Sequence, residues 1–341
     1  MNPRFLQKTG AVMASALLKS IFVVLLLAIS APSSSSIPFV VFHGIADQCD
    51  SKEVSQFPQL LSNWSGSKGY CMYVVVIRLA RSLLQEIGDG FWDSWFMPLY
   101  KQAEIACEKV KELKELSNGY NIVGLSQVLK KHSVDSFQGN LIGRAVLEFC
   151  DDGPPVNNFV SLAGPHAGEA SVPLCGSGTI CLVLGNLIKS PIYSDYVQDH
   201  LAPSGYIKIP TDIPKYMEKC KFLPKLNNEN STERNSTYKT RFTSLQNLVL
   251  IKFENDTVLV PRETSWFGYY SVGTFNTILP PQQTALYKED WIGLKTLDDA
   301  GRVKYISVMG NHLKISHDDM KKHIVPYLEE KLEEPIRQAL L

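Results

Sequence analysis

Runs of consecutive apolar residues recur along the chain and alternate with segments of helical periodicity. A strand covered on both faces of a sheet has such a continuous apolar pattern. The predicted strands are Pro38–His43, Met72–Ile77, Tyr120–Gly124, Asn158–Leu162, Asn247–Phe253 and Lys304–Met309. A helix is predicted from Lys101 to Leu116, where Cys107, Val110 and Leu113 recur every third residue, and another from Leu141 to Phe149. Strands and helices in alternation predict an α/β fold with a mostly parallel sheet.

One long segment departs from this pattern. Residues 169–245 have no strong strand signal and are rich in glycine, proline, asparagine and serine. We interpret them as a helical lid or cap with loops, placed between two parts of the core. The core would then comprise residues 37–168 and 246–335.

The first thirty or so residues have the order of a secretory signal peptide. Arg4, Lys8 and Lys19 precede the apolar run Ile21–Ile29, and small residues follow up to Ala31. This order predicts a signal peptide over residues 1–31. The apolar run is too short for the ~20 residues that a membrane-spanning helix needs, although an uncleaved signal anchor is the alternative. We therefore expect a protein of the secretory pathway, in a lysosome or vacuole or outside the cell, without a stable transmembrane span after cleavage.

Cysteines and glycosylation tripeptides are compatible with this route. Acceptor tripeptides for N-glycosylation begin at Asn63, Asn230, Asn235 and Asn255. The seven cysteines are Cys49, Cys71, Cys107, Cys150, Cys175, Cys181 and Cys220. In an oxidising compartment these cysteines are expected to form disulfides, and Cys175 and Cys181 are close enough in sequence to close a short loop. The odd number leaves at least one without a partner in the chain, and several buried free thiols are the alternative.

Charge and motifs argue against several classes of protein. Lys+Arg and Asp+Glu are equal at 34 each, so the formal net charge is zero and no polyanionic partner such as nucleic acid is indicated. The sequence contains no phosphate-binding glycine loop and no metal-ligand spacing. We expect neither a metal nor a cofactor.

The strand Tyr120–Gly124 leads into an interrupted nucleophile elbow. In the motif G-x-S-x-G, a serine at a sharp strand-to-helix turn is followed two residues later by glycine. Here Gly124 and Ser126 are present, but Val128 occupies the position of the second glycine. Removal of the eleven residues 128–138 would bring Gly139 to that position. The pattern indicates a serine hydrolase with an insert, residues 128–138, at its chemical centre.

Three side chains suited to acyl transfer follow predicted strands in the order Ser126, Asp256, His312. Open parallel sheets place functional groups beyond the carboxyl ends of their strands, and this order is that of the α/β-hydrolases. Ser126 would be the nucleophile, His312 the base and Asp256 the group that orients it. Backbone N–H groups of Gln127 and Ile45 are the candidate oxyanion donors.

Each of these residues also has a plainer interpretation. The serine could be a turn residue or helix cap, the aspartate a turn residue, and the histidine a satisfied loop residue. The combination in order favours the triad. Other histidines compete less well, because His43 and His166 sit in glycine-rich turns and His132 lies inside the insert.

The residues from Ile37 to Pro326 resemble the palmitoyl-protein thioesterases, lysosomal hydrolases of lipid thioesters. The matching stretches are Val41–Asp47, Gly119–Gln127, Lys252–Thr257, Trp266–Tyr270, Leu286–Asp290, Ile292–Lys295 and His312–Leu313. The Trp-Phe-Gly-aromatic and Gly-Leu-Lys stretches are more specific than the elbow.

The resemblance implies a particular fold, reaction and set of residues. It implies an α/β-hydrolase fold with a lid-like acyl-binding segment, and hydrolysis of fatty thioesters on protein cysteines without a cofactor. The same triad and oxyanion donors are implied, with disulfides Cys107–Cys150 and Cys175–Cys181 and glycosylation at Asn235 and Asn255. A Cys49–Cys71 disulfide is our own expectation and is not implied by the resemblance. The substrates would be S-palmitoylated proteins or peptides and other fatty acyl thioesters.

Two segments depart from the family, residues 72–85 and the insert. An insert continued in line with the following helix would carry Cys150 about 16 Å from Cys107, at ~1.5 Å per residue. The disulfide would be kept if the extra turns projected beyond the sheet, over the active site, or if the insert formed a bulged loop. A misaimed oxyanion donor would lower the rate by roughly 10²–10³. The alternatives are therefore an impaired isoform that binds acyl chains or proteins, and another lipase or carboxylesterase.

Overall fold

The computed structural model describes residues 36–43, 49, 52–72, 96–126, 138–170 and 192–329. The chain divides into two units, Met1–Ser36 and Ile37–Leu341, and the description below concerns the second. Several predictions fall outside the described residues: the signal peptide, residues 73–85, Ile45, Gln127, residues 128–137 of the insert with His132, and the Cys175–Cys181 disulfide.

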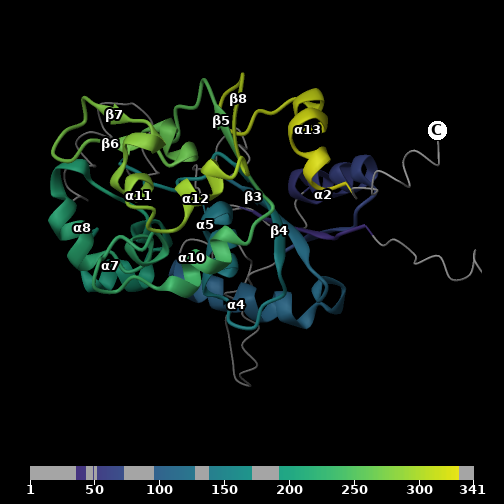
Figure 1. The fold of residues 1–341 in the computed structure, drawn as a ribbon, viewed down its shortest axis with the longest axis horizontal. Helices are drawn as coiled ribbons and strands as arrows, with labels where there is room; N and C mark the ends of the chain where they lie inside the picture. The colour runs from purple at the N-terminus through teal and green to yellow at the C-terminus, as the bar shows by residue number, and fades with distance from the viewer. Residues whose placement is uncertain are drawn as a thin grey trace, which may run out of the picture. The chain divides into compact units, whose positions relative to one another are not determined.

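Six parallel strands form the central sheet, in the order β2-β1-β3-β4-β5-β8. Figure 1 labels β3, β4, β5 and β8 of this sheet. Their bounds are β1 Phe39–Phe42, β2 Gly69–Cys71, β3 Tyr120–Leu125, β4 Val156–Leu162, β5 Asn247–Phe253 and β8 Val303–Val308. Every residue of β1 and β3 is buried, as continuous apolar runs require. The predicted α/β fold with a mostly parallel sheet is confirmed. The fold is that of an α/β-hydrolase, in which a serine, an aspartate and a histidine follow strands in that order.

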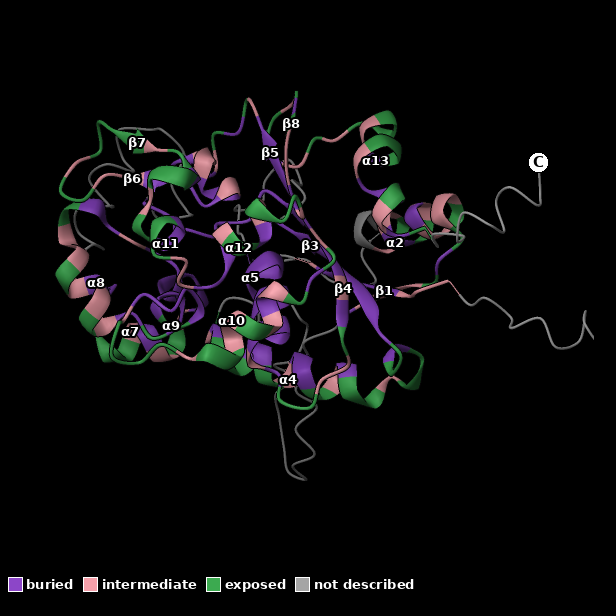
Figure 2. Ribbon diagram, in the orientation of Figure 1, coloured by how far each residue is buried: buried purple, intermediate pink, exposed green. Residues whose placement is uncertain are grey.

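Helices of different character flank the sheet. They include α2 Lys52–Ser65, α4 Leu99–Glu112, α5 Gln138–Phe149, α10 Ser236–Thr243 and α13 His317–His323. Figure 2 shows α5 as an almost wholly buried helix, and each of its residues from Gln138 to Glu148 is buried. The predicted helix over 101–116 is shorter than expected, because Leu113 adopts an extended conformation and a 3₁₀ turn, Lys114–Leu116, follows it.

Strand boundaries differ from the predictions at one edge of the sheet. The edge strand β2 ends at Cys71, so the described part of the predicted strand Met72–Ile77, Met72 itself, lies outside it. A disulfide joins Cys71 to Cys49, with the two Cα atoms 5.7 Å apart. A short antiparallel pair, β6 Tyr269–Tyr270 with β7 Ile278–Leu279, was not predicted, because two-residue strands are too short to produce an alternating pattern.

The segment 169–245 consists of short helices where it is described. They are α7 Asp195–His200, α8 Ile213–Lys219, α9 Leu223–Leu226 and α10, with 3₁₀ turns between them. Tyr206, Tyr216 and Phe242 are buried and belong to the same apolar cluster as the sheet. The segment therefore packs on the core through large aromatic side chains. No helix in the described part of the chain is both long and apolar enough to cross a bilayer.

Candidate active site

The side chains of Ser126, His312 and Asp256 meet at the carboxyl edge of the sheet. Ser126 Oγ lies 2.5 Å from His312 Nε2, and His312 Nδ1 lies 2.7 Å from Asp256 Oδ2. All three residues are buried. A carboxylate can only accept a hydrogen bond, so the proton of a neutral imidazole ring belongs on Nδ1 and Nε2 accepts from the serine hydroxyl. This arrangement can remove a proton from the hydroxyl and deliver it elsewhere.

Ser126 is positioned by the junction of β3 and α5, where two glycines allow close packing. A Cβ on Gly124 would lie 2.5 Å from Asn140 Oδ1 and 2.8 Å from Asn140 Cα. A Cβ on Gly139 would lie 2.2 Å from the carbonyl oxygen of Phe42 and 2.6 Å from that of Leu125. Only glycine fits at both positions without movement of the backbone. Gly139 therefore has the close backbone surroundings expected of the second elbow glycine, although eleven residues of sequence separate it from Gln127.

The position of the insert bears on the Cys107–Cys150 disulfide. This disulfide is present, with Cα atoms 5.4 Å apart. Helix α5 begins at Gln138, so the described part of the helix holds only the last residue of the insert. The disulfide contradicts the arrangement in which the insert displaces Cys150 along the helix axis.

Asp256 and His312 are held by the turns that follow β5 and β8. The carboxylate oxygen Oδ1 of Asp256 accepts hydrogen bonds from the N–H groups of Val258 (2.9 Å) and Leu259 (3.1 Å), which leaves Oδ2 for the imidazole. The N–H of Asn255 donates to the carbonyl of Gly310 at 3.0 Å and joins the two turns. The pairing of β5 with β8, together with this hydrogen bond between their turns, therefore holds Asp256 and His312 close to one another.

Two buried polar residues near these turns were not anticipated from the sequence. Asn140 donates from Nδ2 to the carbonyl of Leu162 at 2.8 Å, which ties the start of α5 to β4. The carboxylate of Glu169 accepts the N–H of Val260 through both oxygens, at 2.9 and 3.1 Å. Glu169 thus steadies the loop after Asp256. Asn140 could have been found in the sequence, because it directly follows Gly139, the candidate elbow glycine. The role of Glu169 depends on its contact with Val260, 91 residues later, and only the folded chain reveals it.

A buried arginine connects α5 with the segment 169–245. Arg144 donates to Glu148 Oε1 (2.9 Å), to Asn227 Oδ1 (3.0 Å) and to the carbonyl of Leu226 (3.2 Å). Its guanidinium lies 5.0 Å from the ring centroid of Phe267. Burial raises the pKa of Glu148, and the charge of Arg144 opposes that rise. Helix α5 is therefore coupled to the predicted lid through charge-assisted hydrogen bonds.

The other histidines have different surroundings. His166 is buried, its Nε2 lies 2.7 Å from Ser161 Oγ, and its ring stacks on Phe267 at 4.7 Å. Burial, followed by the charge of Arg144, lowers the pKa of His166 well below its usual value of 6.5. These contacts agree with a structural role in the core. His43 is half-buried at the end of β1.

The remaining predicted sites are spread over the surface and core. Asn63 and Asn255 are exposed, whereas Asn230 and Asn235 are half-buried. Cys220 is a buried free cysteine, and burial raises the pKa of its thiol to about 12, so it is an unreactive thiol. The described residues include no cluster of histidine, cysteine and carboxylate side chains placed to hold a metal ion.

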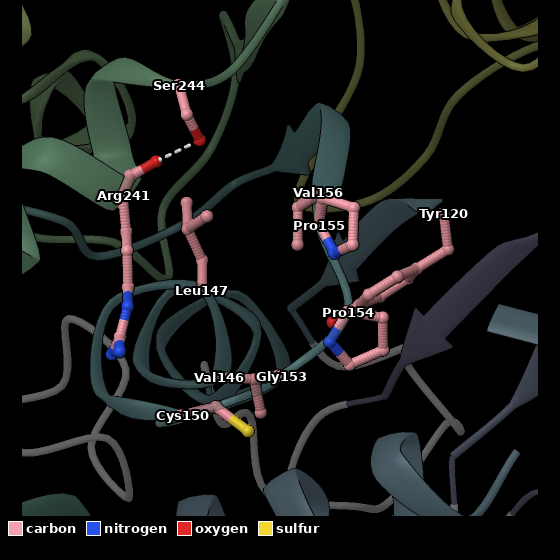
Figure 3. Close-up of a pocket in the computed structure, with 10 residues that line it drawn as sticks. All are labelled: Tyr120, Val146, Leu147, Cys150, Gly153, Pro154, Pro155, Val156, Arg241 and Ser244. Carbon is pink, nitrogen blue, oxygen red and sulfur yellow. Dashed lines mark hydrogen bonds between the residues drawn. The ribbon is translucent and has the colours of Figure 1, made fainter. Parts of the chain in front are cut away.

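Figure 3 shows a small pocket at the opposite end of the sheet. Tyr120, the first residue of β3, lines it together with Val156, Arg241 and Ser244. Ser126 follows the other end of this six-residue strand, about 20 Å away at ~3.3 Å per residue. The pocket is therefore separate from the candidate active site.

Comparison with known proteins identifies a family and several relatives. The family model described as Palmitoyl protein thioesterase matches residues 38–312. Palmitoyl-protein thioesterase 1 of Caenorhabditis elegans is 35% identical over 295 residues, which are 86% of this chain and 92% of that protein. Palmitoyl-protein thioesterase 3 of Dictyostelium discoideum is 31% identical over 318 residues, 92% of this chain and 99% of that protein. Lysosomal thioesterase PPT2-B of Xenopus laevis is 33% identical over 183 residues, 52% of this chain and 61% of that protein.

Proposed function

The chain belongs to the palmitoyl protein thioesterase family, and we propose that it removes long-chain acyl groups from protein cysteines by a Ser-His-Asp mechanism. The observation that carries this proposal is the unbroken hydrogen-bonded path from the Ser126 hydroxyl through His312 to Asp256, at 2.5 and 2.7 Å. Membership of the family supports a thioester hydrolase, and the geometry supports the assignment of roles.

In the first half of the reaction, Ser126 Oγ attacks the thioester carbonyl carbon while His312 Nε2 takes the hydroxyl proton. Asp256 stabilises the resulting imidazolium and keeps its orientation. N–H groups of Gln127 and Ile45 are proposed to bind the oxyanion of the tetrahedral intermediate. When the carbon–sulfur bond breaks, the cysteine sulfur leaves and receives the proton from Nε2, and the acyl group remains on Ser126.

In the second half, water attacks the acyl-serine carbonyl and gives one proton to His312 Nε2. The intermediate collapses, the fatty acid leaves, and the proton returns to Ser126 Oγ. A thiol with a pKa of about 8.5 is a good leaving group, so one buried base is sufficient for this chemistry. No cofactor takes part in this sequence of steps.

We assign acyl-chain binding to the segment 169–245, as a lid on a core made of residues 37–168 and 246–335. Support comes from the short helices α7–α10 and from the link between Arg144 and Leu226–Asn227. A buried chain contributes about 0.8 kcal/mol per CH₂, so a long acyl group can supply most of the binding free energy. S-palmitoylated proteins or peptides are the proposed substrates, and a lysosomal, vacuolar or secreted location is proposed from the lysosomal relative and the disulfides.

The test is hydrolysis of a palmitoylated cysteine peptide by the purified full chain. Ser126→Ala is expected to abolish turnover. The matched control is Ser265→Ala, because Ser265 is equally buried and its hydroxyl has no hydrogen-bond partner among the described residues. Equal activity of the Ser126→Ala variant and the wild type would reject Ser126 as the nucleophile. A parallel assay with an oxygen ester separates a thioesterase from a lipase or carboxylesterase.

Deletion of residues 128–138 tests the proposal that the insert impairs the enzyme. If the insert misaims the oxyanion donor, the deletion is expected to raise turnover by about 10²–10³. Equal turnover of both forms would mean that the elbow functions with the insert in place. An inactive full chain that still binds palmitate would instead support the role of an acyl binder.

A further inference from the structure

The segment from Thr264 to Tyr287 contains no charged residue, in a chain of which 20% is charged. It is bounded by Glu263 and Lys288 and contains the hairpin of β6 and β7. The ends of this segment are buried, but residues 270–280 are exposed or half-buried, and a surface stretch of this length normally has charges that keep it in water. The absence of charge on this exposed stretch therefore suggests that it contacts something other than water.

The hairpin exposes apolar side chains close together. Val272 is 74% exposed, Phe275 41% and Ile278 40%. Tyr270 lies directly opposite Ile278 in the strand pair, and its ring packs against Phe275 with centroids 5.5 Å apart. Figure 2 shows β7 among the exposed elements. These four side chains, which we call the hairpin tip, form one apolar surface.

The hairpin tip is held in place by the rest of the protein. The N–H of Gly273 donates to the carbonyl of Pro210 at 2.8 Å, and that of Ser271 donates to the carbonyl of Thr277 at 2.8 Å. Gly273 has a φ of +84°, which suits the turn and disfavours other residues. The apolar groups are thus presented on a fixed frame.

An apolar cavity adjoins the tip. It has a volume of about 220 Å³, and Tyr270, Val272 and Leu279 line one side of it. Its polar end holds Lys208 and Glu229, whose charges neutralise one another at 2.7 Å. The space is large enough for part of an aliphatic chain. The surface and its cavity therefore combine apolar character with zero net charge.

We propose that the hairpin tip docks on the surface of a lipid bilayer, with its apolar side chains among the acyl chains of zwitterionic lipids. Uncharged apolar residues backed by tyrosine suit the boundary between headgroups and acyl chains. The segment has no cation that could pair with anionic headgroups, which favours zwitterionic lipids over anionic ones. The cavity gives a lipid chain a place to enter. The lipid contact is independent of the triad, and only its use in reaching membrane-borne thioesters depends on the proposed function.

The test is co-sedimentation of the full chain with phosphatidylcholine vesicles. The wild type is expected to bind, and to bind equally well at raised salt, because no charge attraction is involved. The triple variant Val272→Asp, Phe275→Asp, Ile278→Asp is expected to bind at least about tenfold more weakly. Tyr196→Asp is the matched control, because Tyr196 is 73% exposed on α7, and it should bind as the wild type does.

Further variants separate the possible outcomes. The double variant Val272→Thr, Ile278→Thr keeps the β-branched shapes and should give an intermediate loss of vesicle binding. Its result shows whether weak binding by the triple variant comes from the lost apolar surface or from misfolding. Ser126→Ala should bind vesicles normally. The double variant Phe275→Asp, Ile278→Asp, which leaves the cavity lining intact, should hydrolyse a soluble acyl thioester at the wild-type rate, so a failure here is distinct from a failure of the proposed function. Undiminished vesicle binding by the triple variant would overturn the proposal. So would concentration-dependent dimerisation of the wild type, without vesicle binding, that the triple variant abolishes.

Discussion

Replacement of Gly139 by alanine tests whether this glycine completes the elbow across the insert. The new Cβ would lie 2.2 Å from the carbonyl oxygen of Phe42, 2.6 Å from that of Leu125 and 2.7 Å from that of His43. Real Cβ contacts essentially never fall below 3.0 Å, so the closest one is short by 3.0 − 2.2 = 0.8 Å. Backbone carbonyls in the sheet cannot rotate away as side chains do. The start of α5 would therefore have to move by about that distance.

The displacement has two expected consequences. Overpacking of this kind costs about 1–3 kcal/mol, and each kcal/mol lowers the melting temperature of a large domain by ~2–4 °C. A shift of about 1 Å beside a catalytic group lowers the rate by about 10²-fold. We therefore expect Gly139→Ala to melt several degrees lower and to hydrolyse a palmitoyl thioester about a hundredfold more slowly.

The matched control is Gly143→Ala, one helical turn further along α5. There the new Cβ would meet side-chain atoms and no backbone, Ile122 Cγ2 at 3.0 Å and Phe42 Cδ2 at 3.3 Å, which would have to move by only a few tenths of an ångström. These can adjust, and alanine is favoured over glycine within a helix by roughly 0.5–1 kcal/mol. We expect stability within about 1 kcal/mol of the wild type and nearly unchanged turnover. Circular dichroism melting and initial rates measure both variants, and a Gly139→Ala protein that matches the wild type in both would refute the assignment.

Three further predictions concern the triad, a disulfide and a buried histidine. Asp256→Asn should lower kcat by about 10⁴, because an amide no longer holds the His312 tautomer, and a loss below tenfold would contradict this orienting role. Removal of the Cys107–Cys150 disulfide, which spans 43 residues, should lower the free energy of unfolding by about 2–4 kcal/mol in denaturant titration, with an unchanged midpoint as the contrary result. The depressed pKa of His166 means that the unfolded chain binds a proton below pH ~6.5 that the folded chain does not, so the free energy of unfolding should fall by up to ~1.4 kcal/mol per pH unit below that value. His166→Gln should flatten this slope between pH 7 and about pH 5, and an unaltered slope would assign the acid sensitivity to other groups.

The sequence alone was sufficient for features that depend on local patterns. Continuous apolar runs predicted β1, β3, β4, β5 and β8, because strands buried on both faces admit few polar residues. Since parallel strands place their carboxyl ends at one edge, the order of three polar residues after three such strands was enough to predict that they meet. The resemblance to a known family added the pairing of Cys107 with Cys150.

Tertiary structure decided what depends on contacts between distant segments. The role of Gly139 follows from three carbonyls that surround it, two of them from residues about a hundred positions earlier in the chain. The link from Arg144 to Asn227 likewise joins segments 83 residues apart, and nothing in the local sequence of either residue indicates it. Close packing and buried hydrogen bonds are properties of the assembled fold, because they depend on which atoms become neighbours rather than on the order of residues along the chain.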